Sequence, residues 1–81
     1  MNKQETYQNL KRSPNNVRFE KIYEIVKIFG FRLKGGKGSH RVFSREGIRE
    51  IINFQNVNGK VKPYQIKQFL KIIEKYGLLE E

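Results

Sequence analysis

The chain has no cysteine, a single histidine and only eight acidic residues among its 81 positions. Without cysteine it can form no disulfide, no thiolate zinc site and no cysteine nucleophile, and a reducing compartment is permitted. One histidine and scattered carboxylates do not supply a cluster of metal ligands. No carboxylate lies near Ser39 and His40 in the sequence, which also disfavours a serine hydrolase. We therefore expect neither a metal nor another cofactor.

Long apolar runs are missing as well. No stretch approaches the roughly 18 apolar residues of a membrane span, and the first residues, MNKQETYQNLKR, lack the apolar core of a signal peptide. We therefore expect a cytoplasmic protein that does not contact a membrane.

Positive charge is abundant and unevenly spread. The chain has 17 lysines and arginines against eight acids, a formal net charge of +9. Residues 13–45 alone carry eight basic and two acidic residues, 8 − 2 = +6, and residues 32–45 contain no acid. Such a concentrated excess is typical of proteins that bind polyanions, of which nucleic acid is the commonest.

The length allows one domain. Residues 3–12 favour a short polar helix whose only apolar contacts are Tyr7 and Leu10, and the Ser-Pro-Asn-Asn sequence at 13–16 favours a turn. We expect residues 1–16 to be an N-terminal extension and linker, and residues 17–81 to be the folded domain.

Hydrophobic spacing predicts the elements of that domain. Apolar residues recur at helical spacing in residues 19–29 and 63–76, each followed by a glycine (Gly30, Gly77) that can end a helix with a left-handed residue. Between the helices, alternation and turn residues predict three antiparallel strands at 31–34, 39–44 and 48–54, with a turn at Gly35-Gly36-Lys37-Gly38. This order, α-β-β-β-α, predicts an α+β two-layer sandwich with both helices on one face of the sheet.

The stretch RLKGGKGSHRVFSR at 32–45 is the candidate site, because it combines fixed positive charge, glycines and the one histidine. Imidazole can accept and donate a proton near neutral pH. Which face of the 39–44 strand points inward stays open. The glycines can serve as turn formers or allow a phosphate backbone to approach, and Ser39 can contact phosphate or cap the turn.

The motifs Gly30-Phe31, Lys37-Gly38-Ser39-His40 with Val42-Phe43, and Lys62-Pro63 opening a helix that ends in Tyr76-Gly77-Leu78 resemble the HicA toxins of bacterial toxin–antitoxin pairs. The resemblance runs from about Val17 to Leu79. It implies a fold like that of double-stranded-RNA-binding domains, an mRNA endoribonuclease that needs no metal, and a HicB antitoxin as partner. It also implies that His40 is catalytic. Many members have a second histidine after the third strand, where this chain has Asn53-Phe54-Gln55-Asn56.

We therefore expect the toxin component of a type II toxin–antitoxin system, with His40 as general acid and base. The residues expected to bind RNA are Lys34, Lys37, Gly38, Ser39, Arg41, Lys60 and Lys62. With one histidine, the leaving 5′-oxygen must take its proton from water, a lysine, Tyr64 or His40 in turn. Two alternatives stay open: a non-catalytic nucleic-acid-binding module, and a protein-interaction domain whose basic face docks on an acidic partner.

Overall fold

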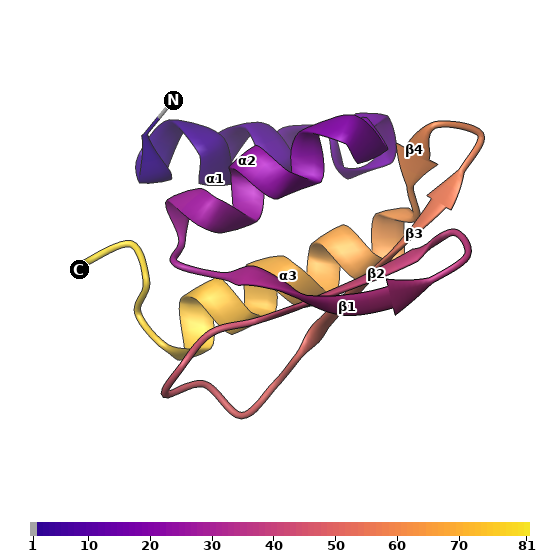
Figure 1. Ribbon diagram of the computed structural model, residues 1–81. Coiled ribbons are helices and arrows are strands. Elements are labelled where there is room, and N and C mark those ends of the chain that lie inside the picture. Colours follow the sequence, from indigo (N-terminus) through magenta and orange to yellow (C-terminus); the bar gives the residue numbers. More distant parts are fainter. Residues whose placement is uncertain (1) are drawn as a thin grey trace.

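The computed structural model describes residues 2–81 and is an α+β fold with its helices on one side of an antiparallel sheet (Figure 1). The helices are α1 (Lys3–Arg12), α2 (Ile22–Ile28) and α3 (Pro63–Lys75), with one-turn 3₁₀ helices η1 (Pro14–Asn16) and η2 (Phe19–Lys21) between α1 and α2. The strands are β1 (Arg32–Lys37), β2 (His40–Ser44), β3 (Ile52–Val57) and β4 (Lys60–Val61), in the spatial order β1-β2-β3-β4. No helix among the described residues is long and apolar enough to cross a membrane.

The predicted fold class is confirmed, with three differences in detail. The sheet has a fourth short strand, β4, in addition to the three that the sequence predicted. The third strand begins four residues later than predicted and continues through Val57, because the turn at 45–47 is followed by further irregular chain up to Ile51.

The third difference is the hairpin turn. Gly35, Gly36 and Lys37 belong to β1, and the turn consists of Gly38 and Ser39 alone. A register shift between Leu33 and Gly35 leaves Lys34 without a direct partner, which is a β-bulge. Short glycine-rich sequences fit a turn and a bulged strand equally well, so the sequence prediction of the turn was wrong.

Both predicted glycine helix ends are present. Gly30 has φ +83°, and the Phe31 amide donates to the Val26 carbonyl at 3.0 Å. Gly77 has φ +60°, and the Leu78 amide donates to the Ile73 carbonyl at 3.0 Å. In each case the apolar residue after the glycine is buried, which returns the chain to the core.

Phe69 of α3 is at the centre of the core and is fully buried. Its ring meets those of Phe29, Phe31 and Phe54 edge to face, with centroids 5.7, 5.7 and 5.9 Å apart. Because these rings come from the end of α2, the start of β1 and the middle of β3, this cluster joins the helices to the sheet.

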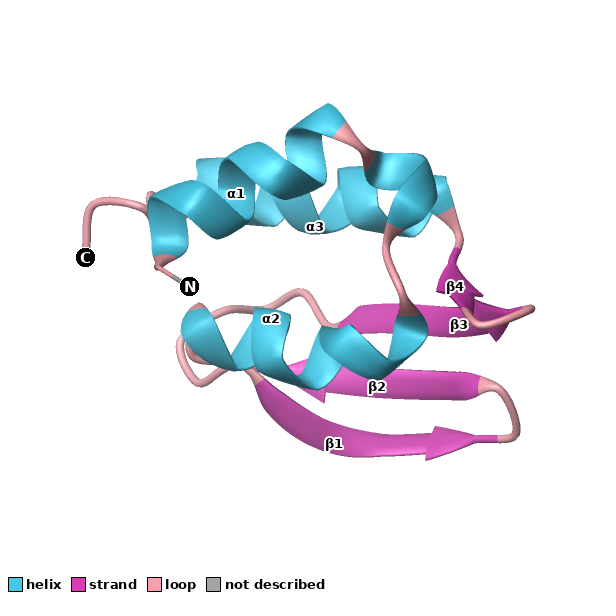
Figure 2. Ribbon diagram, turned by 90° about the horizontal axis from the view of Figure 1, so that it is seen from above, coloured by secondary structure: helices cyan, strands magenta, loops and turns pink. Residues whose placement is uncertain are grey.

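The N-terminal helix α1 packs against α3 and adds Tyr7 and Leu10 to the same core (Figure 2). The Tyr7 hydroxyl donates to Glu74 on α3, and Lys3 forms an ion pair with Glu81 at 3.2 Å. Residues 3–12 are therefore helical as expected, and they are attached more closely to the rest of the chain than their polar sequence indicated.

Candidate functional site

The register of the strands decides which way His40 points. Phe43, Ile52 and Phe54 are buried beneath the helices, so their neighbours along β2 and β3 point to the opposite side of the sheet. We call that side the open face. It carries His40 and Val42 from β2 and Asn53 and Gln55 from β3. His40 is half-buried there, not enclosed in the core.

Two lysines share the open face with His40, because residues directly opposite each other in a ladder lie on the same side of the sheet. Lys37 on β1 is opposite His40, and His40 is opposite Gln55, so these three form one row across the sheet. Lys60 on β4 is opposite Val57, which lies two residues beyond Gln55 on the same face. The hairpin end of the open face thus combines imidazole, two ammonium groups and amides.

The imidazole is held by a neighbour that sequence reasoning did not select. Nδ1 of His40 lies 3.2 Å from Oδ1 of Asn53, on the adjacent strand. An amide oxygen only accepts hydrogen bonds, so this contact places the proton of the neutral ring on Nδ1 and leaves Nε2 as a proton acceptor. Asn53 and Gln55 occupy outward-facing positions of β3, two residues apart. The sequence prediction ended this strand at residue 54, so it did not show that the two amides share a face.

Arg41 lies on the opposite side of the sheet from His40. It is opposite Gly36 and Phe54, so its side chain starts on the helix side of the sheet. Its Nη1 donates to the carbonyls of Gly38 and His40, at 2.8 and 2.7 Å. Arg41 therefore ties down the hairpin turn behind His40.

The Gly38-Ser39 turn is fixed from the other side as well. Gly38 has φ +60°, and the Asn56 amide donates to the Ser39 carbonyl at 2.8 Å, which joins the turn to β3. Gln65 of α3, which is 4% exposed, accepts from the Gln55 amide at 2.8 Å. The peptide that precedes His40 is thus held by β3, and Gln55, the residue opposite His40, is held by α3.

The remaining predicted RNA-binding lysines are at different distances along the sheet from this site. Lys34 is the extra residue of the β1 bulge, in the middle of the edge strand. Lys62 directly precedes α3, and its Nζ is 6.0 Å from the ring centre of Tyr64, whose side chain is 54% exposed. Because β4 leads straight into α3, Lys62 and Tyr64 are near the same end of the sheet as Lys60.

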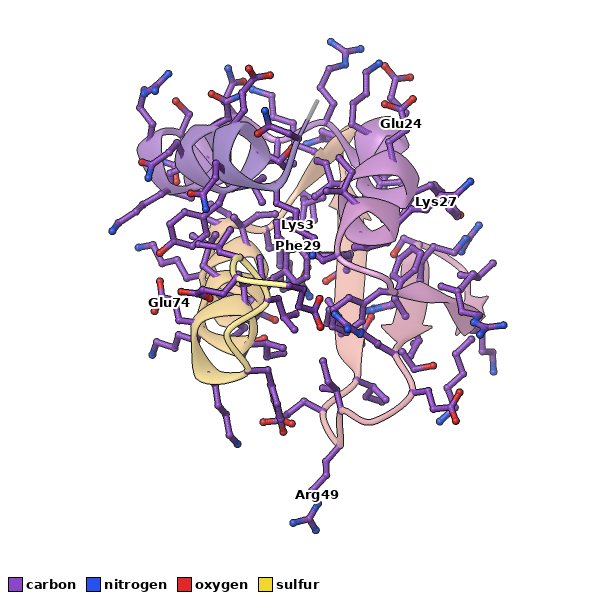
Figure 3. All side chains as sticks on the ribbon, turned by 90° about the vertical axis from the view of Figure 1, so that its left-hand side faces the viewer. Lys3, Glu24, Lys27, Phe29, Arg49 and Glu74 are labelled. Carbon is purple, nitrogen blue, oxygen red and sulfur yellow. The ribbon has the colours of Figure 1, made fainter. Side chains whose placement is uncertain are left out.

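The strands contribute no acidic side chain to the open face. Residues 32–45 and 51–73, which include all four strands and most of α3, contain no aspartate or glutamate. Glu50 pairs with Lys75 at 2.7 Å and Glu81 pairs with Arg45, both near the opposite end of β2 and β3 (Figure 3 shows all side chains). Among residues 2–81, no three His, Cys, Asp or Glu side chains gather as metal ligands.

A sequence model of the family described as the HicA toxin of bacterial toxin–antitoxin matches residues 19–75. This span is more than half of the chain and contains all four strands, α2, α3 and His40. The protein belongs to the HicA toxin family. Searches of curated proteins and of solved structures gave no significant match. The family match begins at Phe19, so α1 of this HicA protein is outside the matched region.

Proposed function

We propose that this HicA toxin is an endoribonuclease that cleaves mRNA without a metal, with His40 as general base and acid. The observation that carries the proposal is the environment of His40, which is on the open face in a row with Lys37. Its Nδ1 is engaged by Asn53 and its Nε2 is left as the acceptor. Family membership supports the toxin role directly.

The proposed reaction uses the 2′-hydroxyl of the RNA as its nucleophile. Nε2 of His40 takes the 2′-hydroxyl proton as the 2′-oxygen attacks the adjacent phosphorus, and the bond from phosphorus to the 5′-oxygen breaks. The products are a 2′,3′-cyclic phosphate and a 5′-hydroxyl, and the proton goes from imidazolium to the leaving oxygen. A lysine, the exposed Tyr64 or water are the other possible proton sources.

The cations have a second role in this proposal. Negative charge grows on the phosphate oxygens in the transition state, and ammonium groups nearby offset it. Lys37 and Lys60 share the open face with His40 and are the first candidates. Lys34 and Lys62 extend the basic surface on either side, where they would bind flanking phosphates.

Gly38, Ser39 and Arg41 would act at the hairpin turn. The turn presents main-chain groups beside His40 without bulky side chains, so that a ribose-phosphate can approach. Arg41 shapes this turn through its bonds to two carbonyls. Its remaining guanidinium nitrogens are the part that we propose for RNA contact.

A His40→Ala variant tests the catalytic assignment. General acid–base catalysis by one group contributes about 10² to 10⁴ in rate, so cleavage of RNA should fall by that order while RNA binding persists. Chelation with EDTA should leave the parent activity unchanged. The control is Lys67→Ala, which removes an exposed charge from α3.

Three results would contradict parts of this proposal. Equal cleavage by His40→Ala would exclude His40 as the catalytic residue, and loss of activity in EDTA would exclude a metal-free reaction. RNA binding by the parent protein with no cleavage would favour the alternative function, a nucleic-acid-binding module of the same fold.

We further propose that a HicB-like antitoxin protein neutralises this toxin in the cytoplasm. Family membership supports an antitoxin partner. The open face is basic and has exposed apolar side chains such as Val57, which is 41% exposed, so an acidic partner surface would cover it and His40 together.

A further inference from the structure

A groove on the helix side of the molecule is separate from the His40 site. It has a volume of about 540 Å³ and lies between the second half of α1, the linker through η1, and the first half of α2. Figure 2 looks down on these helices, with the sheet beneath α2. His40 is on the other side of the sheet, so ligands could occupy both places at once.

The walls of the groove are held in place without a ligand. On the α1 side, Tyr7 bonds to Glu74 of α3. The linker is pinned to the β3–β4 hairpin, because the Val61 amide donates to the Val17 carbonyl at 3.0 Å and the Phe19 amide donates to the Gly59 carbonyl at 2.9 Å. A preformed groove has little ordering entropy to lose when it binds.

The floor of the groove is aliphatic and its rim is mainly cationic. Leu10, Val17 and Ile25 form the apolar part of the lining. Three cations, Arg12, Arg18 and Lys21, face one carboxylate, Glu24. Arg18 bonds to Glu20 at 3.1 Å, whereas Arg12 and Lys21 have no ion pair among residues 2–81.

This lining fits a polypeptide better than RNA. Single-stranded RNA is held by aromatic platforms for its bases together with cations for its phosphates. The groove lining has cations but no aromatic side chain, and its apolar surface comes from aliphatic residues. A peptide whose aliphatic side chains are flanked by carboxylates would complement both the apolar floor and the cationic rim.

We propose that the α1–α2 groove is a docking site for an acidic segment of a partner polypeptide, with an aliphatic side chain seated on Leu10, Val17 and Ile25. The carboxylates of that segment pair with Arg12 and Lys21. Seven of the ten lining residues lie between residues 9 and 18, outside the family match, and the other three lie inside it. Most of the site is therefore built by the part of this chain that precedes its family-matched region.

Three fluorescein-labelled synthetic peptides test this proposal with the full-length protein. All three have leucine at alternate positions, and the positions between are glutamate, glutamine or lysine. Fluorescence anisotropy should show binding of the glutamate peptide only, and amide chemical shifts should change at residues 9–25. Binding with no preference among the three, or no binding at millimolar peptide, would overturn the proposal.

A pair of charge-matched variants locates the binding. Arg12→Glu with Lys21→Glu reverses two rim cations, and Lys27→Glu with Lys67→Glu reverses two exposed cations elsewhere on α2 and α3. The rim variant should weaken binding of the glutamate peptide by about tenfold or more. Each lost ion pair and each new repulsion contributes part of that loss, and the two substitutions add up. The control variant should change it by less than about twofold.

Three further outcomes would contradict the proposal. If both double variants weaken binding equally, only net charge is recognised. If the amide shifts fall on β2 and β3, or if a short single-stranded RNA shifts the groove amides instead, the groove is not a peptide site. Neither double variant touches the open face, so RNA cleavage should persist in both, and a failure here is distinct from a failure of the nuclease proposal.

Discussion

At the scale of single residues, His40 and Asn53 form the most informative contact. The amide oxygen of Asn53 at 3.2 Å from Nδ1 selects one tautomer of the ring and fixes its orientation. Asn53 is thus a positioning residue in the proposed reaction, acting through His40 rather than on RNA. The family pattern has a second histidine in many members near this part of the chain, and here the region supplies an amide.

The variant Asn53→Asp tests this positioning role. A carboxylate beside Nδ1 favours the imidazolium form, so the acidic limb of the pH–rate profile should move to higher pH. Thermal melts should change little, because Asn53 is exposed. Steady-state cleavage measured across pH is the readout, and an unmoved profile would contradict the role.

Gly36 is required for a different reason. A β-carbon built at Gly36 would clash with the His40 carbonyl oxygen and lie 3.1 Å from Cδ of Arg41. The backbone of β1 can therefore approach the hairpin only if residue 36 has no side chain.

Gly36→Ala should destabilise the fold by about 1 to 3 kcal/mol, in the range of overpacked sites. It should also lower RNA cleavage, because the atoms that must move belong to His40 and Arg41. Gly35→Ala is the matched control: nothing lies within 4 Å of its β-carbon, so its melting temperature should stay near the parent value. Equal melting temperatures for Gly36→Ala and Gly35→Ala would contradict the predicted clash.

At the scale of elements, two carboxylates tie loops to the helices away from the site. The Lys75 ammonium and Tyr76 hydroxyl hold the pKa of Glu50 at about 2, below its ordinary 4.5. Arg45, and then Lys3, hold the pKa of Glu81 at about 2. The first clamp joins the loop before β3 to the end of α3, and the second joins the end of the chain to α1 and to the loop after β2.

These clamps predict a loss of stability in acid. A carboxyl whose pKa is lower in the folded state stabilises that state above its unfolded pKa, and the contribution disappears as pH falls through the folded pKa. The melting temperature should therefore drop between about pH 4.5 and pH 2.

The variant Glu50→Gln should melt at a lower temperature than the parent protein at pH 7. Its further drop between pH 4.5 and pH 2 should be smaller, because one of the two titrating clamps is gone. Glu46→Gln, a change in the same loop at a residue with no ion pair among residues 2–81, should follow the parent curve. If the melting temperatures of Glu50→Gln and the parent fall in parallel as the pH is lowered, Glu50 is not one of the groups that cause the loss of stability in acid.

At the scale of the whole molecule, charge is separated by location. The eight acids lie on α1, η2, α2, the loop before β3, α3 and the C-terminal end, whereas the sheet contains none. The edge strand β1 is exposed along its length, and its bulge and lysines discourage pairing with another sheet. The sheet is therefore arranged to attract a polyanion rather than a second strand.

This arrangement predicts how RNA affinity depends on salt. Each lysine that neutralises a phosphate contributes about 0.7 to the slope of log affinity against log salt for single-stranded RNA. Lys37→Ala and Lys60→Ala should each weaken binding and reduce the slope by about that amount. Lys67→Ala on α3 should leave the slope unchanged, and equal slopes for all three variants would contradict the proposed binding surface.

Several features were predictable because they depend on neighbours in the chain. Helical spacing and the glycines at 30 and 77 locate α2, α3 and their ends, and the charge count and motifs identify the basic hairpin. The limits of the glycine turn and of β3 were not predictable, since strand pairing with distant residues decides them. The contribution of α1 was also underestimated, because its few apolar residues gain a core only when α3 is beside them.

The sequence by itself determined the order of helices and strands, the helix ends and the concentration of cations around one histidine, because backbone preference and charge are local properties. Only the tertiary structure decided that His40 faces away from the core, that Asn53 holds its ring, and that Arg41 supports the turn from behind. Those relations depend on the register between strands, in which a shift of one residue moves every side chain to the other face.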